Sequence, residues 1–503
     1  MAQINVTNLT YGYENSVDLI FENVSFSIDT NWKLGFIGRN GKGKTTFLKL
    51  LQGKYEYTGS ITSAERFDYF PYQAAERHGK ECAAEFIEEC KPGCEQWRVI
   101  CELGKLSADA ELLYRPFETL SWGERTKVLL AVLFSGENEF LLIDEPTNHL
   151  DHNSREIVKQ YLREKKGFIL VSHDRDLLDA CIDHVLVLNR QTIEVQSGNF
   201  TSWWENKRRA DQFAVAENEK HRKEIAALKK AADRSDRWAK KNENTKIGYD
   251  PVKEHDRCIA TRAYIGVKTK KMQSRVTQFE RRIEREIEEK EGLLQDIENP
   301  ESLKLNSLRY HKERLVWCRD LSLSYGQEEK TVLRDFSFEL MQGERVFLQG
   351  GNGCGKSTLI RAILEQTDSS IIRNGELHTA SGLIFSYVCQ DTGFLQGGIK
   401  EFCRNRKLDE SLFFTLLRKL DLERAQFGKR LEELSEGQKK KVLIAASLMT
   451  SAHVYIWDEP LNYIDVFSRM QIEELLLACK PTMLLVDHDV RFRDKIATRV
   501  VEL

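Results

Sequence analysis

The chain has 503 residues, of which 41% are apolar and 30% are charged, and its formal net charge is −3 at pH 7. That length is too great for a single hydrophobic core, so two or three domains are expected. The near-neutral charge, taken alone, neither favours nor excludes a nucleic-acid partner.

The chain begins with MAQINVTNLT, which has no basic region and no apolar stretch, so no signal peptide is predicted. The longest apolar run, VLLAVLF at 128–134, is far shorter than the roughly 18–20 residues that a membrane span needs. The eleven cysteines include no CxxC pair, which indicates reduced thiols rather than a disulfide framework or a zinc site. These features predict a cytoplasmic protein.

The first motif is GRNGKGKTT at 38–46, which fits the GxxxxGK[ST] pattern. An apolar run (LGFI) precedes it and a helix-like run (FLKLL) follows, as a phosphate-binding P-loop requires. Backbone N–H groups of such a loop curl around phosphate oxygens. Lys44 is expected to meet the β and γ phosphates, and Thr45 to hold Mg²⁺. The predicted ATP contacts in this loop are Gly38, Asn40, Gly41, Gly43, Lys44, Thr45 and Thr46.

Five further motifs follow in order. Gln73 closes DYFPYQ, LSWGE occupies 120–124 with Ser121 and Gly123, FLLIDEP contains Asp144 and Glu145, NHLD ends at Asp151, and LVSHD contains His173. Phosphoryl transfer to water needs charge neutralisation, a metal and an oriented nucleophile. We therefore expect Asp144 to bind the Mg²⁺ shell, Glu145 to polarise water and His173 to hydrogen-bond the γ-phosphate.

The same motifs return in the second half. GGNGCGKST at 350–358 repeats the P-loop, and the lysines, serines, glutamates and histidines recur at offsets of 312, 314, 314 and 315. Such constant spacing means two copies of one domain. The second set of candidate residues is Gly350, Asn352, Gly353, Gly355, Lys356, Ser357, Thr358, Gln390, Ser435, Gly437, Asp458, Glu459, Asp465 and His488.

The segment between the copies is predicted to be an antiparallel helical hairpin. Residues 205–241 contain no Gly or Pro and are rich in strong helix formers. Residues 264–298 carry apolar side chains at helical spacing and are predicted to form the second helix, which runs back toward the cassettes. The outgoing arm would reach roughly 55 Å. Gly248 and Pro251 lie in the predicted turn.

Charge is uneven along this hairpin. Between 220 and 275 there are seventeen Lys and Arg against seven Asp and Glu, a net of +10. A basic projection on an acidic body favours contact with RNA phosphate, although charged helices are often simply solvated. The candidate RNA-contacting tip lies at about 241–264 and its surroundings, with Trp238, Lys246, Ile247, Tyr249, Val252, Lys253, Arg257, Ile259 and Tyr264.

Together these motifs resemble the ATP-binding cassette family over both copies. The resemblance implies an α/β fold, with two P-loop nucleotide-binding domains in tandem joined by the hairpin. Tyr13 and Tyr325 would stack on adenine, with Tyr11 as a near neighbour, and Gln73 and Gln390 would join the Mg²⁺ shell. The cassettes would pack head to tail within a monomer. Ser435 and Gly437 would then complete the Lys44 site, and Ser121 and Gly123 the Lys356 site.

Three positions depart from the family pattern. The signature is usually LSGG[QE], and here Trp122 and Glu436 replace its first glycine. The change is harmless if only the second glycine must approach phosphate; alternatively, Trp122 slows one site or shapes a partner surface. Cys354 occupies a free position of the second P-loop, where a packed thiol is favoured over a redox switch.

DEPTNHLD at 144–151 resembles the ABC-F group of ribosome-binding ATPases. DEPLNYID at 458–465 carries Leu461 and Tyr463 in place of Thr and His, as in the antibiotic-resistance branch. The first cassette has no inserted arm, and only 15 residues follow His488; both features resemble the Lsa-type subgroup, and no C-terminal extension is expected. The expected domains are 1–204, 205–300 and 301–503.

This resemblance implies binding to the exit site and 23S rRNA of the bacterial ribosome, with the hairpin pushing toward P-site tRNA. Lincosamides, streptogramin A and pleuromutilins would then be displaced from the peptidyl-transferase centre. Two alternatives stay open, a housekeeping ABC-F translation factor and the ATPase subunit of a transporter. A DNA-maintenance ATPase is a further alternative, although it would carry zinc modules or much longer coiled coils.

Overall fold

The fold is given by a computed structural model of the chain. The structure describes residues 2–13, 19–72, 82–92, 94–137, 139–148, 150–189, 192–244, 274, 278, 281–282, 305–325, 330–351, 353–365 and 371–503. Two compact units are present, one made of Met1–Trp203 with Pro300–Leu503 and the other of Trp204–Asn299.

A six-stranded sheet forms the core of the first cassette. Its strand order is β5-β6-β7-β3-β8-β9, and every neighbouring pair is parallel except β8 with β9. Because parallel strands are covered on both faces, they consist of continuous apolar runs such as FLLI and FILV. The strands are β5 (Arg66–Phe70), β6 (Glu139–Asp144), β7 (Phe168–Val171), β3 (Lys33–Ile37), β8 (His184–Leu188) and β9 (Ile193–Ser197).

The second cassette repeats this core with five parallel strands in the order β14-β15-β16-β12-β17. Its second strand, β15, is fully buried, with Tyr455 and Trp457 in the core. The strands are β14 (Phe385–Val388), β15 (Val454–Asp458), β16 (Met483–Val486), β12 (Arg345–Gln349) and β17 (Arg499–Glu502).

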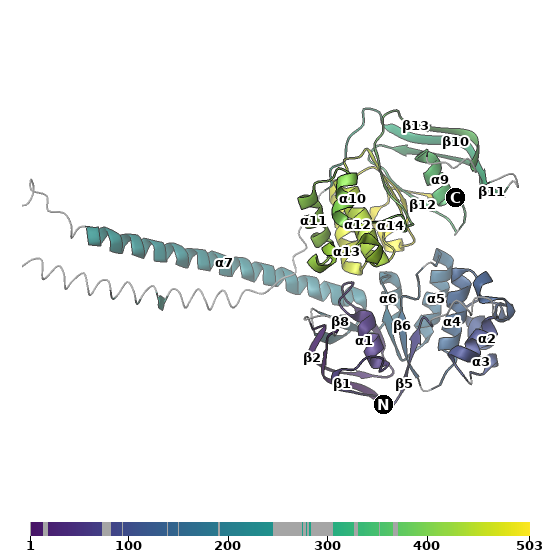
Figure 1. Cartoon of the computed structure of the whole chain (residues 1–503), viewed down its shortest axis with the longest axis horizontal. Coiled ribbons are helices and arrows are strands. Elements are labelled where there is room, and N and C mark those ends of the chain that lie inside the picture. Colours follow the sequence, from purple (N-terminus) through teal and green to yellow (C-terminus); the bar gives the residue numbers. More distant parts are fainter. Residues whose placement is uncertain are drawn as a thin grey trace, which may run out of the picture. The chain divides into compact units, whose positions relative to one another are not determined.

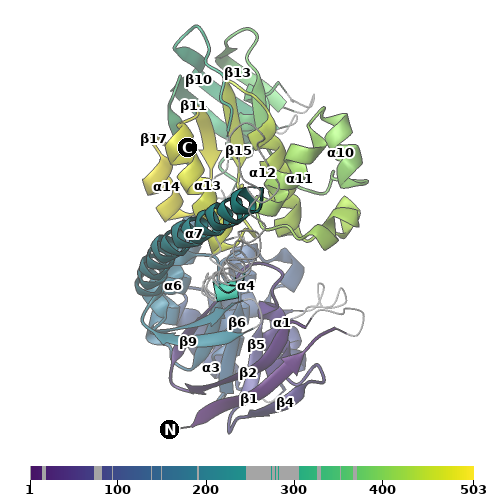
Figure 2. The same ribbon diagram turned by 90° about the vertical axis from the view of Figure 1, so that its left-hand side faces the viewer.

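Each cassette also has a three-stranded antiparallel sheet, in the orders β2-β1-β4 and β11-β10-β13. In Figure 2 the purple strands β1, β2 and β4 lie together near the N-terminus. The strands are β1 (Gln3–Tyr11), β2 (Phe21–Asp29) and β4 (Thr58–Thr62), and then β10 (Arg314–Tyr325), β11 (Lys330–Met341) and β13 (Ile371–Thr379).

Helices that follow the parallel strands position the motifs. The P-loop after β3 leads into α1 (Lys44–Leu51), and the P-loop after β12 leads into α9 (Lys356–Ile363). In such sheets, ligands bind beyond the carboxyl ends of the strands, where these loops lie. The remaining core helices are α5 (His152–Glu164), α6 (Arg175–Cys181), α13 (Val466–Cys479) and α14 (Val490–Ile496).

A helical subdomain carries each signature motif, as the resemblance implies. In the first cassette it contains α2 (Ala83–Cys90), α3 (Gln96–Lys105), two 3-10 helices (Ala110–Tyr114 and Phe117–Thr119) and α4 (Trp122–Leu133). In the second it contains α10 (Ile399–Asn405), α11 (Glu410–Lys419), two 3-10 helices (Arg424–Gly428 and Leu431–Glu433) and α12 (Glu436–Met449). The predicted α/β fold with tandem cassettes is therefore confirmed.

The outgoing arm of the predicted hairpin is the helix α7 (Phe200–Asn244), which runs unbroken for 45 residues (Figure 1). It begins before the predicted residue 205, because Phe200 and Trp203 are buried in the cassette unit. At 1.5 Å per residue, its length is about 67 Å. The turn and most of the return arm lie outside the described residues, so the hairpin itself stays a prediction. Among the described helices, none combines the length and the apolar character needed to span a bilayer.

Candidate nucleotide-binding sites

Both P-loop lysines are buried and donate to carbonyls of their own loop. The Lys44 ammonium donates to Gly38 O at 2.6 Å and Arg39 O at 3.1 Å. In the same way, Lys356 donates to Gly350 O at 2.9 Å and Gly351 O at 2.8 Å. Each helix then starts after a left-handed glycine, Gly43 or Gly355, with φ of 106° and 101°. The two P-loops therefore have matching geometry, each with its lysine ammonium held against the loop.

The residues expected to hold Mg²⁺ are already paired with one another. Thr45 Oγ1 donates to Asp144 Oδ2 at 3.0 Å, and Ser357 Oγ donates to Asp458 Oδ2 at 2.8 Å. The second carboxylate oxygen of Asp458 is buried and accepts no hydrogen bond from the described residues. A hydroxyl and a carboxylate beside the P-loop are the ligands that Mg²⁺ prefers. These residues thus fit the metal.

The glutamate and histidine of each cassette are brought together. His173 Nε2 lies 3.3 Å from Glu145 Oε1, and His488 Nε2 lies 3.5 Å from Glu459 Oε1. Both glutamates have left-handed backbones, with φ of 52° and 48°. Such strain in a non-glycine residue concentrates at functional sites. In the second cassette, Gln390 also donates to Glu459 Oε2 at 2.9 Å.

The two glutamates differ in protonation. Burial and, to a lesser extent, the Asp144 carboxylate raise the pKa of Glu145 to about 8, although Arg469 and Lys44 oppose the shift. For Glu459, burial also disfavours the charge, but His488, Lys440 and Gln390 outweigh it and lower the pKa. Glu459 is therefore ionised at neutral pH, whereas Glu145 keeps its proton until the local charges change.

This difference predicts that two matched variants without nucleotide respond differently to pH. A carboxyl whose folded pKa is raised contributes stability below its unfolded pKa of about 4.5 and loses it as the pH rises through about 8. Thermal melting should therefore show Glu145→Gln gaining stability relative to wild type between pH 5 and pH 9. Glu459→Gln is the control and should show no such gain. Equal pH slopes for all three proteins would contradict the assignment.

The two tyrosines occupy equivalent places beside the P-loop helices. Tyr13 Oη lies 2.8 Å from Thr46 Oγ1, and Tyr325 Oη lies 3.0 Å from Thr358 Oγ1. The sequence predicts Tyr13 for adenine stacking, with Tyr11 as a near neighbour. In the structure Tyr11 is buried, whereas Tyr13 is 42% exposed with its edge near Tyr11 and Tyr55. Tyr13 is therefore the ring that is open to a base.

Both signature serines begin a helix. Ser121 caps α4 and Ser435 caps α12, each in a reciprocal capping box with Glu124 or Gln438. Trp122 and Glu436, which replace the first glycine of each signature, differ in exposure and in their contacts. Trp122 is 61% exposed with Arg125 over its ring. Glu436 accepts hydrogen bonds from Thr392 and Lys439, which fixes its carboxylate within its own cassette.

At the Lys44 site, the second cassette contacts the first P-loop. Asn40 Nδ2 donates to Tyr463 O at 2.8 Å. A Cβ added to Gly437 would lie 2.4 Å from Tyr463 O and 3.5 Å from Asn40 Nδ2. The signature glycine of one cassette therefore lies against the P-loop of the other, as head-to-tail packing requires.

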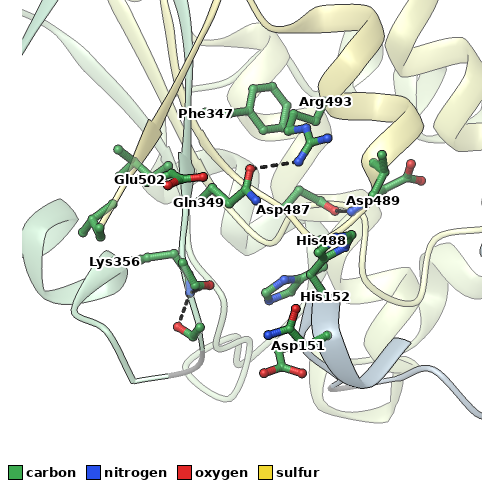
Figure 3. A pocket seen from close by; sticks show the side chains of 16 residues that line it. Asp151, His152, Phe347, Gln349, Lys356, Asp487, His488, Asp489, Arg493 and Glu502 are labelled. Atoms are coloured by element: carbon green, nitrogen blue, oxygen red, sulfur yellow. Dashed lines mark hydrogen bonds between the residues drawn. The ribbon is translucent and has the colours of Figure 1, made fainter. Parts of the chain in front are cut away.

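At the Lys356 site, the first cassette contributes Asp151 of its NHLD motif, with His152 and Asn153, to the lining of a cavity of about 210 Å³. Figure 3 shows Asp151 and His152 on one side of this cavity and Lys356 and Gln349 on the other, with His488 beside His152. Each P-loop is thus met by residues of the other cassette.

Ion pairs distinguish the two P-loops. Arg39 pairs with Asp421 at 2.6 Å, and Lys42 pairs with Glu423 at 2.7 Å, both across the cassettes. The equivalent positions in the second P-loop are Gly351 and Cys354, which carry no cation. Cys354 instead places its Sγ 3.8 Å from the Lys356 ammonium.

Reversing one of these charges should weaken ATP binding at the Lys44 site. Partly exposed pairs contribute roughly 0–1 kcal/mol, so Arg39→Glu should lower the ATP affinity about threefold to tenfold, since it also adds repulsion. The measurement uses a fluorescent ATP analogue in a Lys356→Ala background. Adding Asp421→Arg should restore affinity, and a double variant as weak as the single one would contradict the pair.

Some predicted residues cannot be placed. Gln73, Asn352 and the tip residues from Lys246 to Tyr264 lie outside the described residues, and the side chain of Trp238 does so as well. Conversely, sequence reasoning missed the residues that cross between cassettes. Arg39 and Lys42 stand inside the first P-loop motif, so inspecting the charged residues of that loop could have identified them. Tyr463 stands in the DEPLNYID string, where its departure from the usual His was the available signal.

Comparison with known proteins agrees with this geometry. The family model described as "ABC transporter" matches residues 21–148 and 333–462. The ribosome protection protein VmlR of Bacillus subtilis (strain 168) is 27% identical over 507 residues, covering 98% of this chain and 85% of that protein. The energy-dependent translational throttle protein EttA of Haemophilus influenzae is 24% identical, covering 96% of this chain and 89% of that protein.

Among solved structures, an archaeal ribosome recycling factor, aABCE1, in complex with the stalk protein aP1 matches with a TM-score of 0.60. The match has 18% identity and covers 98% of this chain and 87% of that one. At that identity the likeness concerns the fold alone. The family match, the paired motifs and the facing P-loops together define an ATPase of the ABC transporter family, to which the chain belongs. Within this family it is an ABC-F protein with a ribosome protection protein among its relatives.

Proposed function

We propose that the protein acts on the bacterial ribosome and protects it from drugs that bind the peptidyl-transferase centre, namely lincosamides, streptogramin A and pleuromutilins. The observation that carries this proposal is the helix α7, which continues for 45 residues from a cassette pair with two facing P-loops. A polar helix of that length, in a strongly basic segment, suits a projection toward RNA. The names of VmlR and EttA point to ribosomes as well.

In this proposal ATP binding closes the cassettes and hydrolysis releases them. Lys44 and Lys356 bind phosphate, while Thr45 with Asp144 and Ser357 with Asp458 would hold Mg²⁺, which neutralises phosphate charge. Glu145 and Glu459 accept a proton from the attacking water, and His173 and His488 orient these carboxylates. Tyr13 and Tyr325 stack on adenine.

We assign the cassettes to 1–204 and 301–503 and the linker to 205–300. Its tip, about 241–264, would contact 23S rRNA and P-site tRNA while the cassettes occupy the exit site. The protein would work as a monomer in the cytoplasm, where ribosomes are.

The drug-protection proposal is tested by comparing drug susceptibility of cells with and without the gene. Loss of the gene should make cells more sensitive to lincosamides and pleuromutilins. Unchanged susceptibility would exclude the resistance role and leave a drug-independent translation factor as the function, as the name of EttA suggests.

The role of the tip is tested in the same cells. Ile247→Ala and Tyr249→Ala should reduce protection while ATP hydrolysis stays within about twofold of wild type. If hydrolysis falls together with protection, the linker is a structural brace for the cassettes instead. Glu205→Ala is a matched control, because the exposed Glu205 side chain forms a long ion pair with Arg209 on the same helix and lies far along the chain from the tip.

A further inference from the structure

The two loops that carry His173 and His488 are joined by ion pairs. Arg175 follows His173 by two residues and binds Glu473 of the second cassette. Its guanidinium also lies 3.9 Å from Asp489, the residue after His488. Glu473 is fully buried and also accepts from Lys495 at 2.9 Å. A buried ion pair of this kind responds strongly to any displacement of one partner.

A second ion pair joins two residues that occupy equivalent positions in the two cassettes. Asp176 and Arg491 each follow their histidine by three residues, and they bind one another. Equivalent residues that meet in this way lie on the pseudo-twofold axis of the pair of cassettes. Two copies of the same cassette would place two like charges at this axis, and these would repel one another. The opposite charges of Asp176 and Arg491 therefore favour the pairing of the first cassette with the second.

Arg491 also reaches the start of α7. Its guanidinium binds Asp179 at 2.6 Å and lies 3.4 Å from Thr201 Oγ1. Asp179 in turn accepts from the backbone N–H of Thr201 at 2.7 Å, and from its hydroxyl as well. Asp179 therefore holds the first turn of α7 and is itself held by the loop of the second histidine.

The first turn is also connected to the Lys44 site. Arg39 of the P-loop lies over the Phe467 ring at 5.9 Å, and Phe467 meets the Trp203 ring at 6.2 Å. Trp203 is only 3% exposed. A P-loop of one site and a histidine loop of the other therefore converge on residues 200–203.

We propose that this cluster, made of Arg175, Asp176, Asp179, Glu473, Asp489 and Arg491, couples both ATP sites to the first turn of α7. Arg491 is the positioning residue of the relay. It acts on α7 through Asp179, and within the described residues its recorded partners are Asp176, Asp179 and Thr201, outside both P-loops, so the proposal predicts a change at α7 without a matching loss of hydrolysis. The coupling belongs to the cassettes and does not depend on the ribosome.

The test is hydrogen exchange of the full chain with and without ATP, in the absence of ribosomes, read by mass spectrometry over residues 198–206. In wild type, ATP should change exchange there at least about twofold. Arg491→Gln should lose that change while hydrolysis stays within about threefold of wild type. Arg491 is partly exposed, so the variant should fold, and Arg491→Lys should recover part of the response.

Lys495→Gln is the matched control. It removes another cation from α14 that pairs with Glu473 inside one cassette, and it should keep the response of α7. Three results would overturn the proposal: no ATP-dependent change in wild type, an unaltered change in Arg491→Gln, or a fall in hydrolysis for that variant as deep as in Glu459→Gln.

Discussion

Replacing both glutamates, Glu145→Gln with Glu459→Gln, should lower ATP hydrolysis by about 100-fold to 10,000-fold, the range that a positioned proton acceptor contributes. Each side chain lies within 3.5 Å of its histidine on a strained backbone. The amide keeps the shape but cannot accept a proton from water. Steady-state phosphate release measures the effect.

The single variants separate the two sites. At neutral pH Glu459→Gln should cost more activity than Glu145→Gln, because Glu459 is the glutamate whose pKa is lowered. Glu156→Gln is a control on α5, where the carboxylate pairs with Lys159 of the same helix. A double variant that keeps a tenth or more of wild-type hydrolysis would contradict the roles of both glutamates.

Gly437→Ala should reduce ATP affinity at the Lys44 site by at least about tenfold. The added methyl carbon would lie 2.4 Å from Tyr463 O, a backbone atom that a side-chain rotation cannot move away. Relief requires Tyr463 to move, which breaks its hydrogen bond with Asn40 of the P-loop. Nucleotide titration in a Lys356→Ala background reports this site alone.

Two alanine variants calibrate this result. In Gly123→Ala the nearest atom is Ser154 Oγ at 3.3 Å, which can rotate, so a smaller loss is expected. Gly104→Ala meets nothing within 4 Å and should bind ATP like wild type. Gly437→Ala with normal affinity, and a normal melting temperature, would show that the contact with Tyr463 is dispensable.

The repeated motifs allowed the tandem cassette fold to be predicted from the sequence, and they supplied the candidate site residues. Local chemistry explains this, because a P-loop, a strand ending in Asp-Glu and a capping serine are each written in a few adjacent residues. Helix α7 was predictable for the same reason, since an uninterrupted run of helix formers needs no tertiary contact to reveal it.

The contacts between cassettes were not predictable in the same way. Arg175 and Glu473, or Arg491 and Asp179, are about 300 residues apart, and single charged residues carry no mark of their partner. The burial of Tyr11 beside the exposed Tyr13 could not be predicted either, because it depends on tertiary packing against neighbours such as Tyr55. The different pKa shifts of Glu145 and Glu459 arise from such tertiary neighbours.

ATP is proposed to close the two cassettes into a pair that acts on ribosomes. The most direct measurement is co-sedimentation of the double variant, Glu145→Gln with Glu459→Gln, with purified bacterial ribosomes. With ATP it should pellet at near-stoichiometric amounts, and with ADP it should stay in the supernatant, as should wild-type protein once its ATP is hydrolysed. If the double variant binds ATP but remains in the supernatant, the account of a ribosome-acting ATPase is wrong.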